Sequence, residues 1–216
     1  MNELFVNLMI FVPLIGAIGC LLPKNNPALS KMIAMVTAIV VLLINIALAV
    51  AFYGEAGDTL YLPSGGDSVV RFITDKVWIE SVNIHYLVGV DCLSMPLLLL
   101  TSILNILIIA AGWNVEKHTK AFMSLYLVLM FGMYGVFLAL DFFLFYVFFE
   151  VSLLPMYFLI GIWGGPRKEY AAIKFFIYTL VGSICLLIVM LGFYFLVPDV
   201  ATGAAAADGK ASFNMI

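Results

Sequence analysis

One acidic side chain, Glu150, lies inside an apolar run, at the end of the segment Asp141-Phe-Phe-Leu-Phe-Tyr-Val-Phe-Phe-Glu150. If this segment is a membrane-spanning helix, nine residues at 1.5 Å each place the carboxyl group about 13 Å deep, near the middle of a hydrocarbon core about 30 Å thick. A carboxylate there is costly, so it is expected to face the bundle interior, water or a partner charge. Proton transfer is the chemistry that such an acid can perform. The competing interpretation is a protonated Glu150 that makes only a structural hydrogen bond between helices.

Lys174 is a second candidate for proton transfer, six residues beyond Lys168 and therefore about 9 Å below that membrane edge. An inward-pointing Lys174 would differ from Glu150 by about 7 Å along the membrane normal, within reach of two side chains and a bridging water. The alternative is a lysine whose long side chain snorkels back to the interface. Pro155 supports a role of this region in proton transfer. It removes the amide that would bond to the Val151 carbonyl, and so frees a polar backbone group near Glu150.

The rest of the chain is almost entirely apolar. Of 216 residues, 65% are hydrophobic and 11% are charged, whereas soluble domains have roughly 45–50% apolar and about 25% charged residues. A net charge of −3 without a basic cluster excludes nucleic-acid binding, which needs clustered lysine and arginine. The 3 cysteines are scattered and there are only 2 histidines, too few ligands for a zinc or iron–sulfur centre. We therefore expect a chain that lies in a lipid bilayer and holds no cofactor or metal.

Six apolar stretches are long enough to cross the bilayer core, which takes about 20 helical residues. They predict an all-α polytopic membrane protein. The stretches are approximately 3–22, 30–53, 89–113, 120–140, 142–163 and 169–197. Residues 1–53 thus hold the first two helices, 89–197 hold helices three to six, and 198–216 form an external loop that leads to a missing C-terminal part.

Residues 54–88 interrupt the apolar pattern with glycines, a proline and several acids, and we expect them to form an external loop. Two short runs within it, 69–74 and 77–84, are rich in β-branched and aromatic residues and flank Asp75-Lys76. This arrangement predicts a small β-hairpin at the membrane surface, between helices 2 and 3, with its turn at Asp75-Lys76.

Charged residues beside the spans predict the orientation, because cytoplasmic loops carry more lysine and arginine. The loops after spans one, three and five carry Lys24, Lys31, Lys117, Lys120, Arg167 and Lys168, and the opposite side carries Arg71, Lys76 and Lys210. We therefore expect the short basic loops in the cytoplasm and the N-terminus outside. Asp91 and Asp141, at the outer ends of spans three and five, are predicted helix N-caps. Small residues predict close helix–helix contacts at Gly132, Gly135, Gly182, Ser183 and Gly192.

Several motifs resemble a known family. They are Gly89-Val-Asp-Cys-Leu-Ser-Met-Pro-Leu97, Phe145-Tyr-Val-Phe-Phe-Glu150 with Leu154-Pro155-Met156, Ile160-Gly-Ile-Trp-Gly-Gly-Pro166 and Tyr170-Ala-Ala-Ile-Lys-Phe-Phe-Ile-Tyr-Thr179. Together they resemble the antiporter-like membrane subunits of bacterial NADH:quinone oxidoreductase (respiratory complex I), in the Mrp-type cation/proton antiporter family. The resemblance covers essentially the whole chain, as the N-terminal portion of a longer subunit whose antiporter-like repeat starts at about residue 120.

This resemblance implies a proton-translocating enzyme subunit in the inner (cytoplasmic) membrane of a bacterium, in a hetero-oligomer with other membrane-arm subunits of complex I. FMN, iron–sulfur clusters and quinone are then expected on partner subunits. In the family, the glutamate that matches Glu150 handles protons and pairs with a lysine on a seventh helix, and Lys174 matches another lysine common in these subunits. Because the seventh helix is absent, we expect the chain alone not to carry protons across a membrane.

Two other kinds of function fit the same residues. A standalone Mrp-type sodium/proton antiporter subunit, or a subunit of a membrane-bound hydrogenase, would share Glu150 and Pro155. A structural or assembly subunit, by contrast, would need only a protonated Glu150 that packs between helices.

Overall fold

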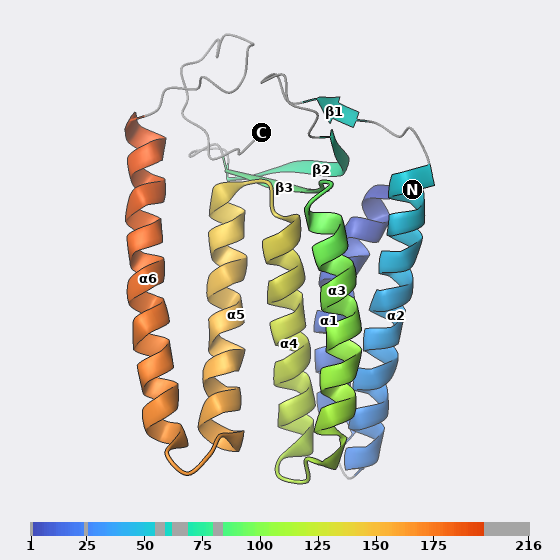
Figure 1. Ribbon diagram of the computed structural model, residues 1–216, viewed down its shortest axis with the longest axis vertical. Coiled ribbons are helices and arrows are strands. Elements are labelled where there is room, and N and C mark those ends of the chain that lie inside the picture. The colour runs from blue at the N-terminus through green and yellow to red at the C-terminus, as the bar shows by residue number, and fades with distance from the viewer. Residues whose placement is uncertain (1, 24–25, 55–58, 62–68, 80–83, 197–216) are drawn as a thin grey trace.

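The computed structural model describes residues 2–23, 26–54, 59–61, 69–79 and 84–196 of the chain, as a row of long helices with a small sheet across one end (Figure 1). The helices are α1 (Asn2–Leu21), α2 (Pro27–Gly54), α3 (Ser94–Ala111), α4 (Thr119–Leu138), α5 (Phe142–Trp163) and α6 (Lys168–Leu196). A short 3-10 helix, η2 (Gly112–Asn114), follows α3. In the described part of the chain, 6 helices are long and apolar enough to cross a membrane, which confirms the predicted all-α polytopic fold.

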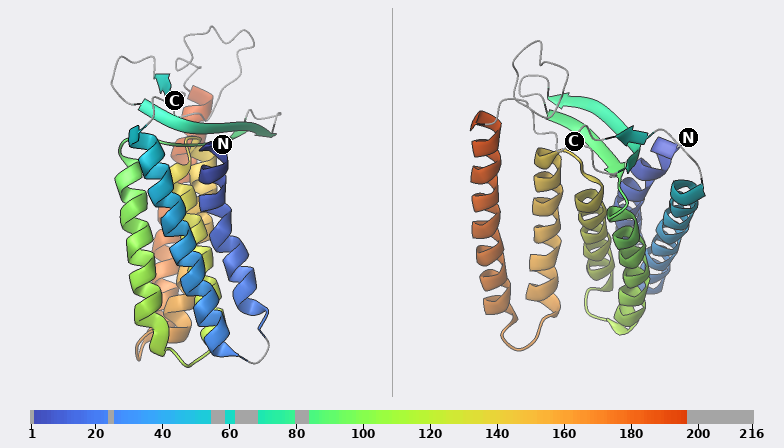
Figure 2. Two further views of the ribbon diagram at one scale, coloured as in Figure 1. Left: turned by 90° about the vertical axis from the view of Figure 1, so that its right-hand side faces the viewer. Right: turned by 45° about the horizontal axis from the view of Figure 1, so that its top comes forward.

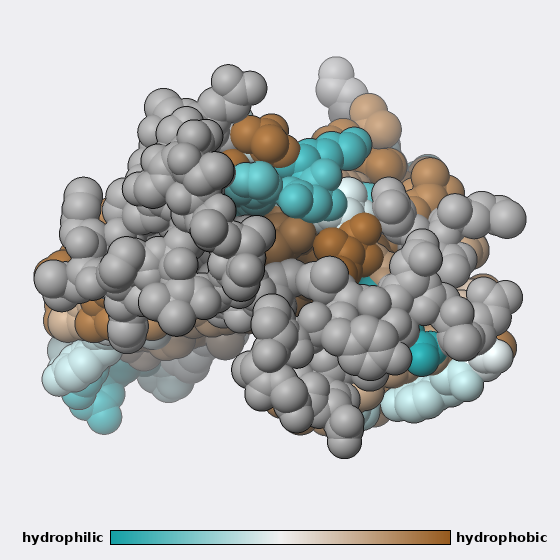
Figure 3. Space-filling view, turned by 90° about the horizontal axis from the view of Figure 1, so that it is seen from above, coloured by the Kyte–Doolittle hydropathy of each residue, from teal (hydrophilic) through white to brown (hydrophobic). Residues whose placement is uncertain are grey.

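The sheet has three antiparallel strands, β1 (Thr59–Tyr61), β2 (Val69–Ile79) and β3 (Ile84–Val90), in the order β1-β2-β3. It lies across the end of the helices, near the N-terminus (Figure 2). Seen from that end, the described residues present a group of hydrophilic side chains flanked by hydrophobic ones (Figure 3). The predicted hairpin between α2 and α3 is therefore confirmed.

The predicted hairpin turn at Asp75-Lys76 is wrong. Both residues lie within β2, where Asp75 pairs with Leu87 and Lys76 pairs with Tyr86 of β3. A two-residue turn favours glycine or asparagine at positions with positive φ, and Asp-Lys supplies neither. The start of the third span is also later than predicted, because Ile84–Val90 forms β3 before the chain enters α3 at Ser94.

The hydrophobic core contains side chains from the four helices α1, α2, α3 and α4, from the first half of α5 and from the inner side of the sheet. In contrast, α6 packs mainly on α5 and stands at the edge of the row (Figure 1). Its buried described residues are Ala172, Ser183 and Met190, whose spacings of eleven and seven residues place them on one face of a helix. A single narrow stripe therefore holds α6 to the other helices.

Glycines allow α4 and α5 to approach closely. A methyl group at Gly132 would lie 2.9 Å from Ser152 Cβ and 3.1 Å from Ser152 Cα, and one at Gly135 would lie 2.2 Å from the Phe148 ring. These two predicted contacts are confirmed. The contacts predicted at Gly182 and Gly192 are wrong for the described residues, because nothing lies within 4 Å of a methyl group at either position.

Substituting Gly132 with alanine should destabilise the bundle by about 1–3 kcal/mol, because the new methyl group overpacks the α4–α5 contact. Gly182→Ala is the matched control, since its methyl group meets open space. Unfolding in detergent mixtures, followed by circular dichroism, measures both free energies. Equal effects of the two substitutions would contradict the close packing at Gly132.

Candidate functional site

The hairpin fixes where α5 begins. Leu140 donates its amide to the Leu87 carbonyl of β3 at 2.9 Å, and Val88 forms a β-bridge with Ala139. Directly after this contact, Asp141 Oδ1 accepts hydrogen bonds from the amides of Phe143 at 2.8 Å and Leu144 at 3.0 Å. Asp141 is therefore the predicted N-cap of α5, and the sheet sets the depth at which each residue of α5 lies.

The two predicted capping carboxylates differ in their surroundings. Asp91 is not the N-cap residue of α3, because Leu93 occupies that position and its side chain forms no capping hydrogen bond. Asp91 Oδ1 nevertheless accepts the Ser94 amide at 2.6 Å, and its carboxylate is partly exposed. Asp141 is completely buried. Burial raises the pKa of the Asp141 carboxyl group above its ordinary value, and hydrogen bonds from backbone amides, among them those of Leu144 and Phe143, act in the opposite direction.

Glu150 lies eight residues beyond the first residue of α5, about 12 Å along the helix axis. Its side chain is half-buried, and its Oε1 atom is buried without a hydrogen-bond partner in the described part of the chain. One turn before it, the Tyr146 hydroxyl lies close to the Glu150 carboxyl group and to Ser183 of α6. Ser183 is only 2% exposed, so this polar group lies between the two helices.

We call Tyr146, Glu150 and Ser183 the Glu150 cluster. It places one titratable carboxyl group, with a free oxygen, beside two hydroxyl groups at the α5–α6 contact. Such an arrangement can hold a proton, release it, or pass it to a hydroxyl group or a water. Tyr146 and Ser183 were not predicted from the sequence as site residues, although the spacing of four residues between Tyr146 and Glu150 already puts them on one helix face.

Lys174 lies on the outer face of α6. Its Nζ atom is 5.8 Å from the ring centroid of Tyr170 and 5.7 Å from that of Tyr178, distances typical of cation–π interactions. Lys174 precedes Ser183 by nine residues, which is half a turn out of phase and about 14 Å along the helix. The structure therefore does not bring Lys174 and Glu150 together.

Pro155 lies inside α5, which continues through it to Trp163. Proline carries no amide hydrogen, so the Val151 carbonyl lacks the partner that it would have in a regular helix. Pro155 itself is buried. The polar backbone group expected next to Glu150 therefore stays a prediction from the sequence.

A second set of buried polar side chains, which was not predicted from the sequence, links α2, α3 and α4. Asn45 Nδ2 donates to Ser102 Oγ at 2.8 Å, and the Ser102 and Tyr134 hydroxyls lie 2.9 Å apart. Asn105 Nδ2 donates to the Tyr134 hydroxyl at 3.2 Å, and Asn105 Oδ1 accepts from the Tyr126 hydroxyl at 2.6 Å. We call these five residues the polar network. It contains no carboxyl, amino or imidazole group, so its role is to hold helices together.

Metal binding finds no support among the described residues, where no group of three or more His, Cys, Asp or Glu side chains could hold an ion.

Comparisons with known proteins identify two matching family models. One, described as "NADH-ubiquinone oxidoreductase chain 4, amino terminus", matches residues 68–141, and the other, "NADH:quinone oxidoreductase/Mrp antiporter, TM", matches residues 139–201. NADH-quinone oxidoreductase subunit M of Rhodobacter capsulatus is 37% identical over 88% of this chain. NAD(P)H-quinone oxidoreductase chain 4 1 of Nostoc sp. is 44% identical over 56% of it. The chain spans 35% and 22% of the lengths of these relatives.

Solved structures give the same result at the level of the fold. Respiratory complex I from Thermus thermophilus contains a chain with 25% identity and a TM-score of 0.72, over 88% of this chain and 36% of that one. An archaeal membrane-bound sulfane sulfur reductase contains a chain with 18% identity and a TM-score of 0.68, over 88% of this chain and 28% of that one. The second similarity shows a shared fold alone.

Replacing Tyr134 with phenylalanine should destabilise the protein by roughly 1–3 kcal/mol, because Ser102 and Asn105 lose a buried hydrogen-bond partner. Tyr53→Phe removes an exposed hydroxyl, on a residue that is 70% exposed, and should change stability by less than about 0.5 kcal/mol. Detergent-mixture unfolding of both variants measures the difference. Equal free energies of unfolding for the Tyr134→Phe and Tyr53→Phe variants would show that the polar network does not contribute to stability.

Asp141→Asn should change how stability depends on pH. Asparagine also caps helices well, but it does not titrate. Because the folded-state pKa of Asp141 is raised, its contribution to stability is complete below the ordinary value of 3.8 and is lost as the pH rises through the folded-state value. The wild-type free energy of unfolding should therefore fall relative to that of the variant as the pH is raised from about 4. A constant difference between the free energies of unfolding of the wild type and the variant, at every pH, would contradict this prediction.

Proposed function

Because this chain belongs to the NADH:quinone oxidoreductase/Mrp antiporter family of membrane subunits, we propose that it serves in proton translocation, as a membrane-arm subunit of an NADH:quinone oxidoreductase. In this role it works in a hetero-oligomer with other membrane-arm subunits. Quinone reduction elsewhere in the complex supplies the energy, and FMN, iron–sulfur clusters and quinone are bound by partner subunits.

The observation that carries this proposal is the position of Glu150. A carboxyl group with an unpartnered oxygen lies about 12 Å inside an apolar helix, at a depth where an acidic side chain is costly and marks a candidate functional site. The Tyr146 and Ser183 hydroxyls provide neighbouring hydrogen-bonding positions. The freed Val151 carbonyl beside Pro155 adds a further polar group at which water can bind.

Lys174 has a different place in the proposed mechanism. Since it faces away from the Glu150 cluster and lies between two tyrosine rings, it would exchange protons with groups that pack against the outer face of α6. Direct exchange with Glu150 through a single water is not supported by this geometry. Lys174 is thus proposed as a proton-handling residue that is separate from the Glu150 cluster.

The chain is a multi-pass membrane protein, and we propose that it lies in the cytoplasmic membrane of a bacterium with the hairpin end outside. Support comes from the distribution of positive charge among the described residues. The end opposite the hairpin carries Lys31, Lys117, Lys120, Arg167 and Lys168, whereas the hairpin end carries Arg71 and Lys76. Positive residues are concentrated on the cytoplasmic side of membrane proteins.

Glu150→Gln in the assembled complex tests the proposal. Glutamine keeps the size and hydrogen-bonding capacity of the side chain but cannot release a proton at neutral pH. We expect normal assembly and loss of most quinone-coupled proton pumping, measured with a pH-sensitive dye in membrane vesicles. Glu169→Gln, at an exposed acid in the first turn of α6, is the matched control and should pump normally.

Unchanged pumping by Glu150→Gln would leave only a structural or assembly role for this chain. Sodium-dependent proton exchange without NADH oxidation would instead indicate a standalone Mrp-type antiporter subunit.

A further inference from the structure

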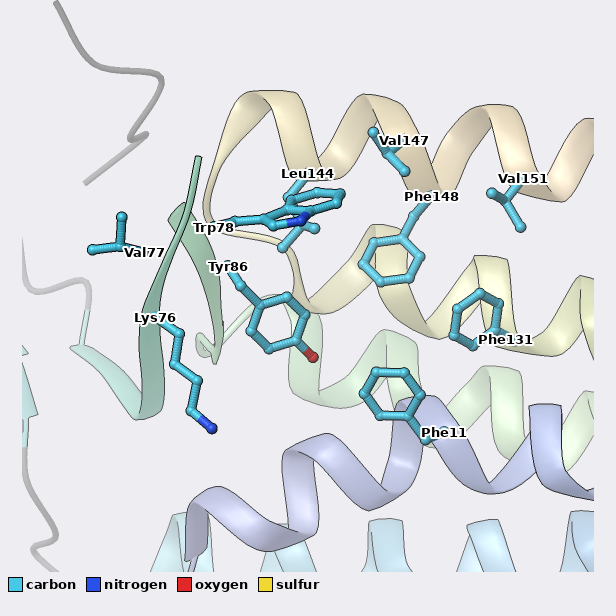
Figure 4. A pocket seen from close by; sticks show the side chains of 10 residues that line it. All are labelled: Phe11, Lys76, Val77, Trp78, Tyr86, Phe131, Leu144, Val147, Phe148 and Val151. Atoms are coloured by element: carbon cyan, nitrogen blue, oxygen red, sulfur yellow. The ribbon is translucent and has the colours of Figure 1, made fainter. Parts of the chain in front are cut away.

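An apolar groove of about 410 Å³ lies beside α1, α4 and α5, with the β2–β3 hairpin at one end (Figure 4). Aromatic side chains from three helices form its floor. The ring centroids of Phe11 on α1 and Phe131 on α4 are 6.0 Å apart, and those of Phe131 and Phe148 on α5 are 5.4 Å apart. Val147 and Val151 of α5 extend the apolar lining away from the hairpin.

The hairpin end of the groove is held in place by hydrogen bonds. The Tyr86 hydroxyl donates to Asn7 Oδ1 of α1 at 2.9 Å, and Asn7 Nδ2 donates to Thr74 Oγ1 of β2 at 3.3 Å. Burial raises the pKa of Tyr86 to about 12, so its hydroxyl remains a donor at physiological pH. The groove is therefore a preformed feature, in which β2 and β3 are tied to α1.

Lys76 provides a positive charge at this end of the groove. Its side chain is exposed, and it forms no ion pair in the described part of the chain. The neighbouring Asp75 carboxylate is already 2.7 Å from His85 Nδ1. Trp78, which also lines the groove, is 52% exposed and packs on Phe143 at a ring distance of 6.3 Å. Tryptophan is enriched at membrane–water interfaces, which places the charge of Lys76 at headgroup level.

We propose that this groove binds one acyl chain of an anionic phospholipid, with the headgroup phosphate against Lys76. From Leu144 to Val151 the lined part of α5 measures about 11 Å, which fits within one leaflet of a core about 30 Å thick. The groove is apolar, so water in it would find few partners, whereas lipid tails surround the helices. The ammonium group at the mouth complements a phosphate and selects for a negatively charged lipid. This binding site is independent of proton translocation.

Fluorescence of Trp78 tests the proposal in the full chain reconstituted in bilayers. Trp113→Phe and Trp163→Phe leave Trp78 as the reporter, because the chain has only 3 tryptophans. Acyl-brominated phosphatidylglycerol or phosphatidylcholine is then titrated into unbrominated phosphatidylcholine, since bromine quenches tryptophan on contact. We expect phosphatidylglycerol to bind about fivefold more tightly, as one lysine near a membrane surface should provide.

Lys76→Gln should bring the two lipids to parity, and Val147→Phe, which fills the groove, should also remove the preference. Lys117→Gln, which removes an exposed charge at the opposite end of the bundle, should keep it. Equal quenching by both lipids in the parent chain, or a preference that survives Lys76→Gln, would overturn the proposal. Absence of quenching by either lipid would overturn it as well, and would show that a second copy or another protein covers the groove.

Discussion

The absence of water from the bilayer core is the constraint on which this structure depends. A polar group placed at that depth must find its partner within the protein, because lipid offers none. The polar network connects α2, α3 and α4 through hydroxyl and amide groups that pair with one another, and only Asn45 Oδ1 among its described atoms is buried without a partner. One oxygen of Glu150 is also buried without a partner in the described part of the chain. The two sets differ in their chemistry, because a carboxyl group can bind and release a proton whereas an amide group cannot.

The hairpin has a positional role in the same scheme. Its last strand binds the chain immediately before α5 and lies beside the buried cap at Asp141. Because a helix is a rigid spacer of 1.5 Å per residue, fixing its first turn also fixes the depth of Glu150. An extramembrane element therefore determines where the carboxyl group lies. The same strands form the end wall of the groove beside α1, so the sheet organises both regions.

Sequence patterns predicted the helices well because each must be long and apolar enough to cross the bilayer, which leaves a strong compositional signal. Local chemistry predicted the cap at Asp141 equally well. The turn at Asp75-Lys76 was misplaced because strand pairing with β3 outweighed a local charge cluster. The sequence predicted least well which face of a helix packs against its neighbours. Lys174 and Gly182 belong to α6, and the nearly uniform apolar composition of this helix does not indicate which face contacts α5. The polar network was missed because it depends on which side chains from three helices meet.

The single stripe of Ala172, Ser183 and Met190 that holds α6 has a consequence for biogenesis. The helices from α1 to α5 share one core, whereas α6 has little to hold it until it meets α5. Among the described helices, α6 then docks last, and it supplies Ser183 to the Glu150 cluster. A partly inserted chain thus exposes an incomplete cluster, which is completed only after α1 to α5 have closed around their shared core.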